Sequence, residues 1–222
     1  MSNPSDIRTW DAWKRAFDVV VAVTALVVLA PLLLVVSVLV RCGGGGPALY
    51  RQTRPGLHGE PFEIVKFRSM RSDPVLERAG ADADHMRITP IGRVLRATSI
   101  DELPNLVNVV CGEMSIVGPR PHLMSYLDLY SPHQGRRHEV RPGITGLAQV
   151  RGRNALDWAT RLDLDVEYVD RRSFGLDIRI LFATVRTVAT GHGVAQPGHV
   201  TMALFEGNEQ LDTSKVLAAT TS

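Results

Sequence analysis

The longest apolar run in the chain extends from Val19 to Val40 and contains no charged residue. As a helix, this run would be roughly 33 Å long, enough to cross the hydrocarbon of a bilayer. Pro31 lies near its middle, where it removes a backbone N–H donor and disfavours helical dihedrals at Ala30, so we expect a bend there. Basic residues flank both ends. Because positive flanks prefer the cytosolic side, this symmetry favours a run that dips into the membrane and returns. A single crossing of the membrane is the alternative that stays open.

Beyond the apolar run, the pattern predicts a small β-hairpin. Residues 48–53 and 61–68 have the composition of strands, and the proline and glycines between them favour a hairpin loop. Lys66 and Arg68 are two positions apart and therefore lie on one face of the second strand. The glycines from Gly43 to Gly46 predict a flexible connection between the apolar run and the hairpin.

The rest of the chain carries mainly helical signals. Thr89 followed by Pro90 offers a hydroxyl cap and a proline at the first helical position, and another helix should begin at Pro104 and stop at Gly112. Residues 156–170 are helical in composition, and residues 176–189 form an amphipathic helix whose apolar stripe suits either a core or a membrane interface. The prediction is a helix-rich α/β protein with three parts: an N-terminal membrane segment (1–46), a compact domain (47–190) and a tail (191–222).

Composition narrows the class of protein. The 222 residues include 25 Lys and Arg against 23 Asp and Glu, and this net charge of +2 is too small to indicate nucleic acid as a partner. A hydrophobic content of 45% excludes a disordered chain. The two cysteines, Cys42 and Cys111, support neither a disulfide framework nor a zinc site and fit a reducing compartment. The signatures of P-loop nucleotidases, dinucleotide-binding folds, zinc proteases and serine hydrolases do not occur.

Asp101 and Glu102 are adjacent carboxylates just ahead of Pro104. A purely structural interpretation exists, since Ser99 and Glu102 fit a capping box at a helix start. Pro104, however, disfavours helical dihedrals at the residue before it and so places the two acids at the threshold of the helix. Carboxylates in that position can aim outward, which makes the pair a candidate for chemistry.

Arginines within reach of this pair indicate phosphate chemistry. Arg96 is close in sequence, and Arg120 lies between two prolines that limit its backbone freedom. Among such cations we expect Asp101 to have a depressed pKa and to be an anion at neutral pH. An anionic carboxylate can coordinate Mg²⁺ or attack phosphorus while guanidinium groups hold phosphate oxygens. An ordinary surface network of acids and arginines is the alternative at this point.

Six motifs follow one another along the chain: Lys14-Arg15 with Asp18, Tyr50-Arg51-Gln52, Lys66-Phe67-Arg68-Ser69-Met70, Asp101-Glu102-Leu103-Pro104, Met114-Ser115 through Gly118-Pro119-Arg120-Pro121, and Arg141-Pro142-Gly143-Ile144-Thr145-Gly146. Together they resemble the bacterial sugar transferase family, the small monotopic phosphoglycosyl transferases. The resemblance implies transfer of a sugar phosphate from a nucleotide diphosphate sugar, with a UDP-sugar expected, to a polyprenol phosphate such as undecaprenyl phosphate. A nucleoside monophosphate is released, and glycan assembly starts on the cytoplasmic face of the bacterial inner membrane.

The resemblance also implies roles for single residues. Asp101 would be the nucleophile that forms an aspartyl-phosphosugar intermediate and would approach Mg²⁺, and Glu102 would complete the dyad as a metal partner or proton acceptor. The other candidates are the phosphate-binding residues Arg96, Arg120, Lys66 and Arg68 and the nucleotide-binding residues Arg141, Gly146, Gln149 and Arg153.

By the same resemblance, the chain is a monotopic membrane protein with a proline-kinked re-entrant helix, interfacial amphipathic helices, a small β-hairpin and a compact cytosolic catalytic domain. The helix would bend at Ala30 and Pro31, and Ala30 lacks the hydroxyl of the serine that the family often has before this proline. Two other functions stay open, a non-catalytic membrane scaffold of glycan assembly and a membrane-anchored phosphohydrolase. Membrane lipids are expected partners, and a homodimer also stays open.

Overall fold

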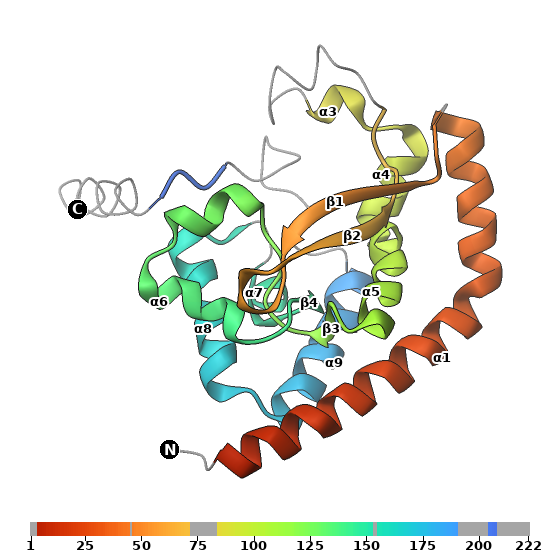
Figure 1. Ribbon diagram of the computed structural model, residues 1–222. Coiled ribbons are helices and arrows are strands. Elements are labelled where there is room, and N and C mark those ends of the chain that lie inside the picture. Colours follow the sequence, from red (N-terminus) through yellow and green to blue (C-terminus); the bar gives the residue numbers. More distant parts are fainter. Residues whose placement is uncertain (1–3, 45, 72–83, 153–154, 191–203, 208–222) are drawn as a thin grey trace.

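A computed structural model of the chain describes residues 4–44, 46–71, 84–152, 155–190 and 204–207. Helices dominate it, and the strands form two small two-stranded sheets (Figure 1). The strands are β1 (Leu49–Pro55), β2 (Pro61–Phe67), β3 (Ser115–Val117) and β4 (Gly143–Thr145). The α-helices are α1 (Pro4–Gly44), α3 (Asp84–Arg87), α4 (Pro90–Thr98), α5 (Leu106–Cys111), α6 (Pro132–Gly135), α7 (Leu147–Arg151), α8 (Trp158–Arg171) and α9 (Phe174–Thr190). Short 3₁₀ helices connect them: η1 (Leu57–Gly59), η3 (Ile100–Asn105), η4 (Met124–Leu129) and η5 (Arg136–Glu139). The expected helix-rich α/β class is confirmed.

The apolar run lies within α1, a helix of 41 residues. Within the described part of the chain, its segment Asp11–Gly43 is the one helix that is long and apolar enough to cross a membrane. Helical structure continues through Ala30 and Pro31, where the sequence predicts a bend. Figure 1 shows α1 following a curved path along one side of the molecule. The proline is therefore accommodated within one continuous helix, as apolar helices tolerate.

Both ends of α1 pack on the same domain. Near its start, the Lys14 ammonium lies 2.6 Å from a carboxylate oxygen of Asp177 in α9. Asp18, one turn later, accepts a hydrogen bond of 2.7 Å from the hydroxyl of Ser115 in β3. Near the end of α1, two valines are buried against side chains of β2 and α4. A helix held in this way at both ends stays with the domain along its whole length.

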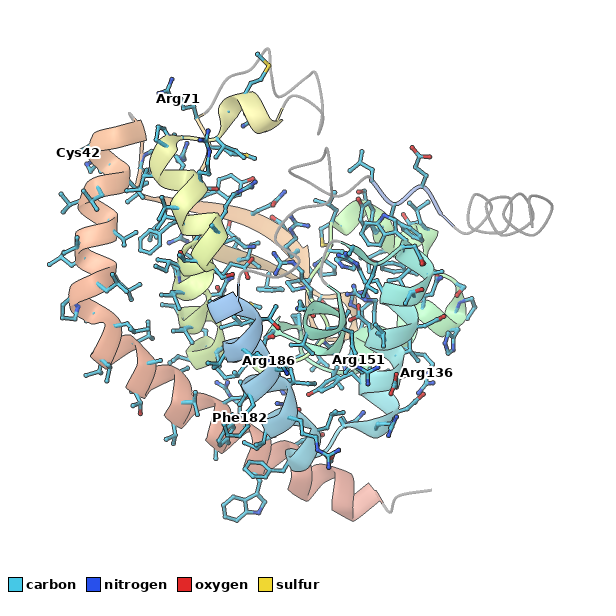
Figure 2. All side chains as sticks on the ribbon, turned by 180° about the vertical axis from the view of Figure 1, so that it is seen from behind. Cys42, Arg71, Arg136, Arg151, Phe182 and Arg186 are labelled. Atoms are coloured by element: carbon cyan, nitrogen blue, oxygen red, sulfur yellow. The ribbon has the colours of Figure 1, made fainter. Side chains whose placement is uncertain are left out.

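Between these contacts, α1 turns apolar side chains away from the domain. Val28 and Leu34 are 69% and 68% exposed. α9 extends this surface, because its Phe182 is 74% exposed, and Figure 2 shows Phe182 on the side of α9 that faces α1. The predicted amphipathic stripe of this helix is thus divided, with Leu181 packed against the core and Phe182 turned outward. Exposed apolar side chains in this number mark a surface that suits contact with another apolar phase or an apolar partner.

The predicted hairpin is confirmed, with β1 and β2 pairing antiparallel and Tyr50 opposite Lys66. Two asparagines of the neighbouring helices hold this hairpin in place. The backbone N–H of Val65 donates to the side-chain oxygens of Asn105 and Asn108 at 3.1 and 3.2 Å, and Asn108 in turn donates to the backbone oxygen of Glu63 at 2.7 Å. Both asparagines are buried, so these polar side chains make an internal contact with the hairpin and do not face water.

The start of α4 is as predicted. The N–H of Gly92 donates to the Thr89 hydroxyl at 2.9 Å, and Pro90 occupies the first turn. A side chain at Gly92 would collide with the backbone of Ser69, since a Cβ there would lie 2.0 Å from the Ser69 oxygen. This close approach brings the end of the hairpin strand and α4 together.

The helix predicted from Pro104 to Gly112 is divided in the structure. Residues 100–105, including Pro104, form η3, and α5 follows and ends at Gly112, whose φ of +91° is the left-handed conformation typical of a helix end. Ser99 has a φ of +58° and makes no side-chain cap, so the capping box is not formed. A left-handed Ser99 directs its hydroxyl away from the N–H groups that a cap would serve.

A second, parallel sheet pairs β3 with β4, which the sequence did not predict. It brings together the two turns that follow these strands. A Cβ on Gly118 would lie 2.4 Å from the backbone oxygen of Arg141, and a Cβ on Gly143 would lie 2.1 Å from the Gly118 nitrogen. Only glycine permits this crossing, which fixes the chain just before Arg120.

Four residues of the predicted tail, 204–207, belong to the folded domain. Phe205 is buried and its ring stacks on Tyr130 with centroids 5.6 Å apart. Its backbone N–H donates to the Tyr126 hydroxyl at 3.1 Å. These four residues of the predicted tail therefore pack on the domain, because burial of the aromatic ring stabilises the contact.

Candidate active site

The two carboxylates lie in the first turn of η3, directly after the left-handed residue Ser99. Ser99 ends α4 and its N–H donates to the Arg96 oxygen, so the chain changes direction there. The asparagine contacts described above hold η3 and α5 against β2. As a result, Asp101 and Glu102 lie between α4, which carries Arg96, and β2, which carries Lys66.

Glu102 forms the centre of a charged cluster. The Lys66 ammonium lies 2.8 Å from its Oε1, and both terminal nitrogens of Arg120 donate to its two oxygens, one of them at 3.1 Å. Burial alone would raise the pKa of Glu102, but the charges of Arg120 and Lys66 outweigh it and hold the pKa far below its usual range. The same carboxylate raises the pKa of Arg120. Glu102 is therefore a permanent anion in this structure.

Asp101 is in a different state from its neighbour. Burial, followed by the adjacent charge of Glu102, raises the pKa of Asp101 to about 6, although Lys66, Arg96 and Arg120 act in the opposite direction. The predicted depressed pKa is therefore wrong, because burial of Asp101 and the charge of Glu102 outweigh the cations around it. Within the described residues, the Asp101 carboxylate has neither a hydrogen bond nor an ion pair. At neutral pH it is still mainly an anion, and its lone pairs are available to a substrate.

The other predicted phosphate-binding residues divide into two groups. Lys66, Arg96 and Arg120 all act electrostatically on Asp101, and Arg96 is oriented by a hydrogen bond of 3.0 Å from its Nε to the Ser69 hydroxyl. Arg68 is directed elsewhere, because its Nε donates to the backbone oxygen of Pro47 at 3.1 Å. The structure thus brings three of the four predicted cations to the dyad and places Arg68 at the connection to α1.

A buried ion pair supports Arg120 and was missed at the level of sequence. Arg137 donates from Nε and Nη2 to a carboxylate oxygen of Asp165 at 3.1 and 2.7 Å, and also to the backbone oxygen of Arg120. Both partners are buried. The two residues are far apart in sequence and belong to no motif, so only the fold reveals that they fix the backbone of Arg120.

The predicted nucleotide-binding residues occupy the loop around β4. The Nε of Arg141 donates to the backbone oxygen of Gly112 at 2.8 Å. Gly146 leaves no room for a side chain, since a Cβ there would lie 2.2 Å from the Gly118 oxygen. Both polar atoms of the Gln149 amide are buried without a hydrogen bond to the described residues. Arg153 lies outside the described residues.

A magnesium ion fits this arrangement through one carboxylate. Within the described chain, no group of three or more His, Cys, Asp and Glu side chains gathers to form a metal site of protein ligands alone. Both oxygens of Glu102 already accept hydrogen bonds from Arg120 and Lys66, whereas Asp101 has free oxygens. Mg²⁺ is commonly held by one or two carboxylates together with substrate phosphates. Asp101 is the residue that suits this role.

Comparison with known proteins identifies the family of this chain. The family model described as "Bacterial sugar transferase" matches residues 9–191. An uncharacterized sugar transferase of Bacillus subtilis, EpsL, is 48% identical over 195 residues, which cover 88% of this chain and 96% of the relative. The UDP-glucose:undecaprenyl-phosphate glucose-1-phosphate transferase of Caulobacter vibrioides is 44% identical over 191 residues, covering 81% and 71%. The UDP-N-acetylgalactosamine-undecaprenyl-phosphate N-acetylgalactosaminephosphotransferase of Aeromonas hydrophila is 40% identical over 190 residues, covering 81% and 44%.

Proposed function

Because the chain belongs to the bacterial sugar transferase family and is an enzyme of the phosphoglycosyl transferase class, we propose that it transfers a sugar-1-phosphate to undecaprenyl phosphate. The donor is a nucleotide diphosphate sugar, with a UDP-sugar as the first candidate. The products are a polyprenyl-diphosphate sugar and a nucleoside monophosphate. The observation that carries this proposal is the Asp101 carboxylate, which lies among Lys66, Arg96 and Arg120 with its lone pairs unused by the described residues.

In the first step, a carboxylate oxygen of Asp101 forms a bond to the phosphorus that bears the sugar. The bond from this phosphorus to the bridging oxygen breaks, and the oxygen leaves with its electron pair as part of the nucleoside monophosphate. No proton is required, because the leaving phosphate departs as an anion. In the second step, a phosphate oxygen of undecaprenyl phosphate attacks the phosphorus of the aspartyl adduct, and Asp101 leaves as a carboxylate.

Glu102 acts in this proposal by holding its cationic partners. Its strongly lowered pKa makes it a poor proton acceptor, whereas its two oxygens orient Arg120 and Lys66 toward the phosphates. Asp101 is the residue that would hold Mg²⁺, and the ion would supply positive charge against the repulsion between the anionic nucleophile and its anionic substrate. Arg96 adds a further positive charge near Asp101.

We propose that α1 is re-entrant and that the domain lies on the cytoplasmic face of the inner membrane. Two features support this topology: both ends of α1 pack on one domain, and its outward face is apolar. The nucleotide sugar is a cytosolic compound and undecaprenyl phosphate is a membrane lipid, so a site beside a shallow helix gives access to both.

The function is tested with a panel of nucleotide sugars in the presence of undecaprenyl phosphate and Mg²⁺. We expect release of a nucleoside monophosphate with at least one member of the panel and only when the lipid acceptor is present. Relatives that use different sugars make a panel necessary. Release of free sugar phosphate without lipid would indicate a phosphohydrolase instead, and no release with any donor would favour a non-catalytic scaffold.

The topology is tested by labelling single cysteines with a membrane-impermeant reagent. Cys42 is exposed at the end of α1 (Figure 2), and Cys111 is exposed on α5 in the domain. We expect Cys42, Cys111 and a cysteine introduced by Asn3→Cys to react only after the cytoplasmic side is opened, each in a variant in which serine replaces the other cysteines. Labelling of Asn3→Cys from the outside of intact cells would show that α1 spans the membrane.

A further inference from the structure

His122 follows Arg120 by two residues and has no role in the steps above. It is buried, and its Nδ1 lies 3.1 Å from the Tyr130 hydroxyl. Arg137 donates to the same hydroxyl oxygen at 3.3 Å. A guanidinium only donates, so the Tyr130 oxygen accepts from Arg137, and the proton of this hydroxyl is available to Nδ1 of His122. Burial raises the pKa of Tyr130, so the hydroxyl keeps this proton at neutral pH.

This network suits one tautomer of His122. Burial, followed by the charges of nearby arginines, lowers the pKa of His122 well below its ordinary value, so the ring is neutral and carries one proton. In the tautomer whose Nδ1 accepts from Tyr130, the proton is on Nε2, and we build on this tautomer. Nε2 is buried and has no hydrogen-bond partner within the described residues. A buried N–H without an acceptor is costly, so this atom indicates a site for an external acceptor.

The surroundings of this N–H carry an excess of positive charge. Four guanidinium groups act electrostatically on the His122 ring, those of Arg54, Arg120, Arg137 and Arg161. Arg137 is neutralised by Asp165 and Arg120 by Glu102. Arg54 donates at 2.6 Å to the neutral amide oxygen of Gln52, and its Nε is buried without a partner in the described structure. Arg161 lies over the ring of Trp158, 5.3 Å from its centroid.

The pKa values of Arg54 and Arg161 also reflect burial of positive charge in this region. Burial, followed by the charge of Arg120, lowers the pKa of Arg54 to about 10 and that of Arg161 also to about 10. Burial removes water from a guanidinium, and a nearby cation adds repulsion, so both effects make the charged form of Arg54 less favourable. A bound anion would restore the balance, whereas a neutral carbonyl group would satisfy the N–H of His122 without offsetting the charge.

We propose that His122 Nε2–H and Arg54 bind the phosphate of the nucleoside monophosphate half of the donor. This inference rests on the proposed function, because this half leaves when Asp101 attacks. Arg120 connects the two sites, because its guanidinium contacts Glu102 and its backbone lies two residues before His122. Its side chain is 37% exposed and therefore accessible to a substrate. The phosphate reaches Nε2 through side-chain rearrangement of the kind common on binding. Negative charge grows on this phosphate as the bridging bond breaks, so these donors stabilise the transition state as well as the product.

The test measures binding of UMP and uridine to the full chain by calorimetry. We expect His122→Phe, which has a similar shape but no donor, to weaken UMP binding about 10- to 100-fold and to leave uridine binding unchanged. His122→Gln, whose amide nitrogen can occupy the position of Nε2, should restore most of the loss. Arg54→Met should also weaken UMP binding and reduce its dependence on salt, and it serves as a second variant if His122→Phe does not fold.

Two matched controls accompany these variants. His138 is a neighbouring histidine whose Nδ1 lies 3.3 Å from the Gly56 carbonyl oxygen, so Nδ1 donates and Nε2 is an acceptor. His138→Phe should therefore keep UMP affinity, as should Arg51→Met, since Arg51 pairs with Glu63 on the exposed side of the hairpin. If folded His122→Phe and Arg54→Met both bind UMP like the wild type, or if they lose uridine to the same extent, the inference is wrong. Such a result would refute the phosphate site but not the proposed function, because the wild type could still turn over. The proposed function is refuted separately, if the wild type is inactive with every donor.

Discussion

Asp101→Asn is expected to reduce sugar-phosphate transfer by at least about 10³-fold and to prevent formation of the covalent phosphosugar adduct. The amide has nearly the same shape as the carboxylate but lacks the anionic oxygen that attacks phosphorus. The measurement is release of nucleoside monophosphate, together with mass spectrometry of the protein after incubation with the donor alone. In the wild type the adduct should be detectable on the peptide that contains residue 101.

The same variant should be more stable than the wild type at neutral pH. The pKa of Asp101 is about 6 in the folded protein and 3.8 as its ordinary value, so ionisation is less favourable in the fold. This cost is absent below about pH 4, develops as the pH rises to about 6, and is complete above it. Asp101→Asn removes it, and we expect a rise in thermal midpoint of roughly 2–4 °C at pH 7 that shrinks toward pH 4.

Asp163→Asn provides the control for both measurements. Asp163 is an exposed acid on α8, 3.9 Å from His133, and its side chain is well hydrated. Removal of its charge should change neither turnover nor the thermal midpoint. Wild-type turnover in Asp101→Asn would exclude Asp101 as the nucleophile, and a lower midpoint would show that the Asp101 carboxylate stabilises the fold.

The elements with local signals could be predicted from the sequence. Thr89 and Pro90 begin a helix because capping and proline geometry act over a few residues, and the hairpin follows from two short strands around a turn. The ordered motifs also contain the dyad and two of the cations near it, Lys66 and Arg120, while Arg96 was named because it is close in sequence. Strands as short as β3 and β4 leave no comparable pattern, since three residues cannot show an alternation.

The electrostatic state of the site could not be predicted, because it depends on which carboxylate receives the arginine. Asp101 and Glu102 are adjacent in sequence, but the side chain of Glu102 contacts Arg120 and Lys66, and the resulting anion raises the pKa of its neighbour. Sequence places the charges in one region without giving their pairing. The sequence also does not show that Asp101 is removed from water, and this burial is the main cause of its raised pKa.

Glu102→Ala is expected to abolish detectable transfer and to destabilise the domain by about 1–3 kcal/mol. The substitution leaves Lys66 and Arg120, whose side chains are 21% and 37% exposed, without their shared counter-charge. Glu102→Gln replaces the carboxylate by an amide of similar shape and should be less destabilising. Its activity should stay low, because Arg120 loses the bidentate contact with a carboxylate that orients it. Thermal or urea unfolding gives the stability, and lipid-linked product gives the activity.

Glu63→Gln is the matched control for this prediction, because Glu63 is also paired with an arginine, Arg51, but both side chains are exposed. An exposed pair of this kind contributes little, so we expect nearly unchanged stability and activity. The comparison separates the effect of charge burial from the loss of an ion pair as such. If Glu102→Gln were as active as the wild type, Glu102 would not orient Arg120 for catalysis. If Glu102→Ala were no less stable than Glu63→Gln, the cluster around Glu102 would be open to water and its cations would need no counter-charge.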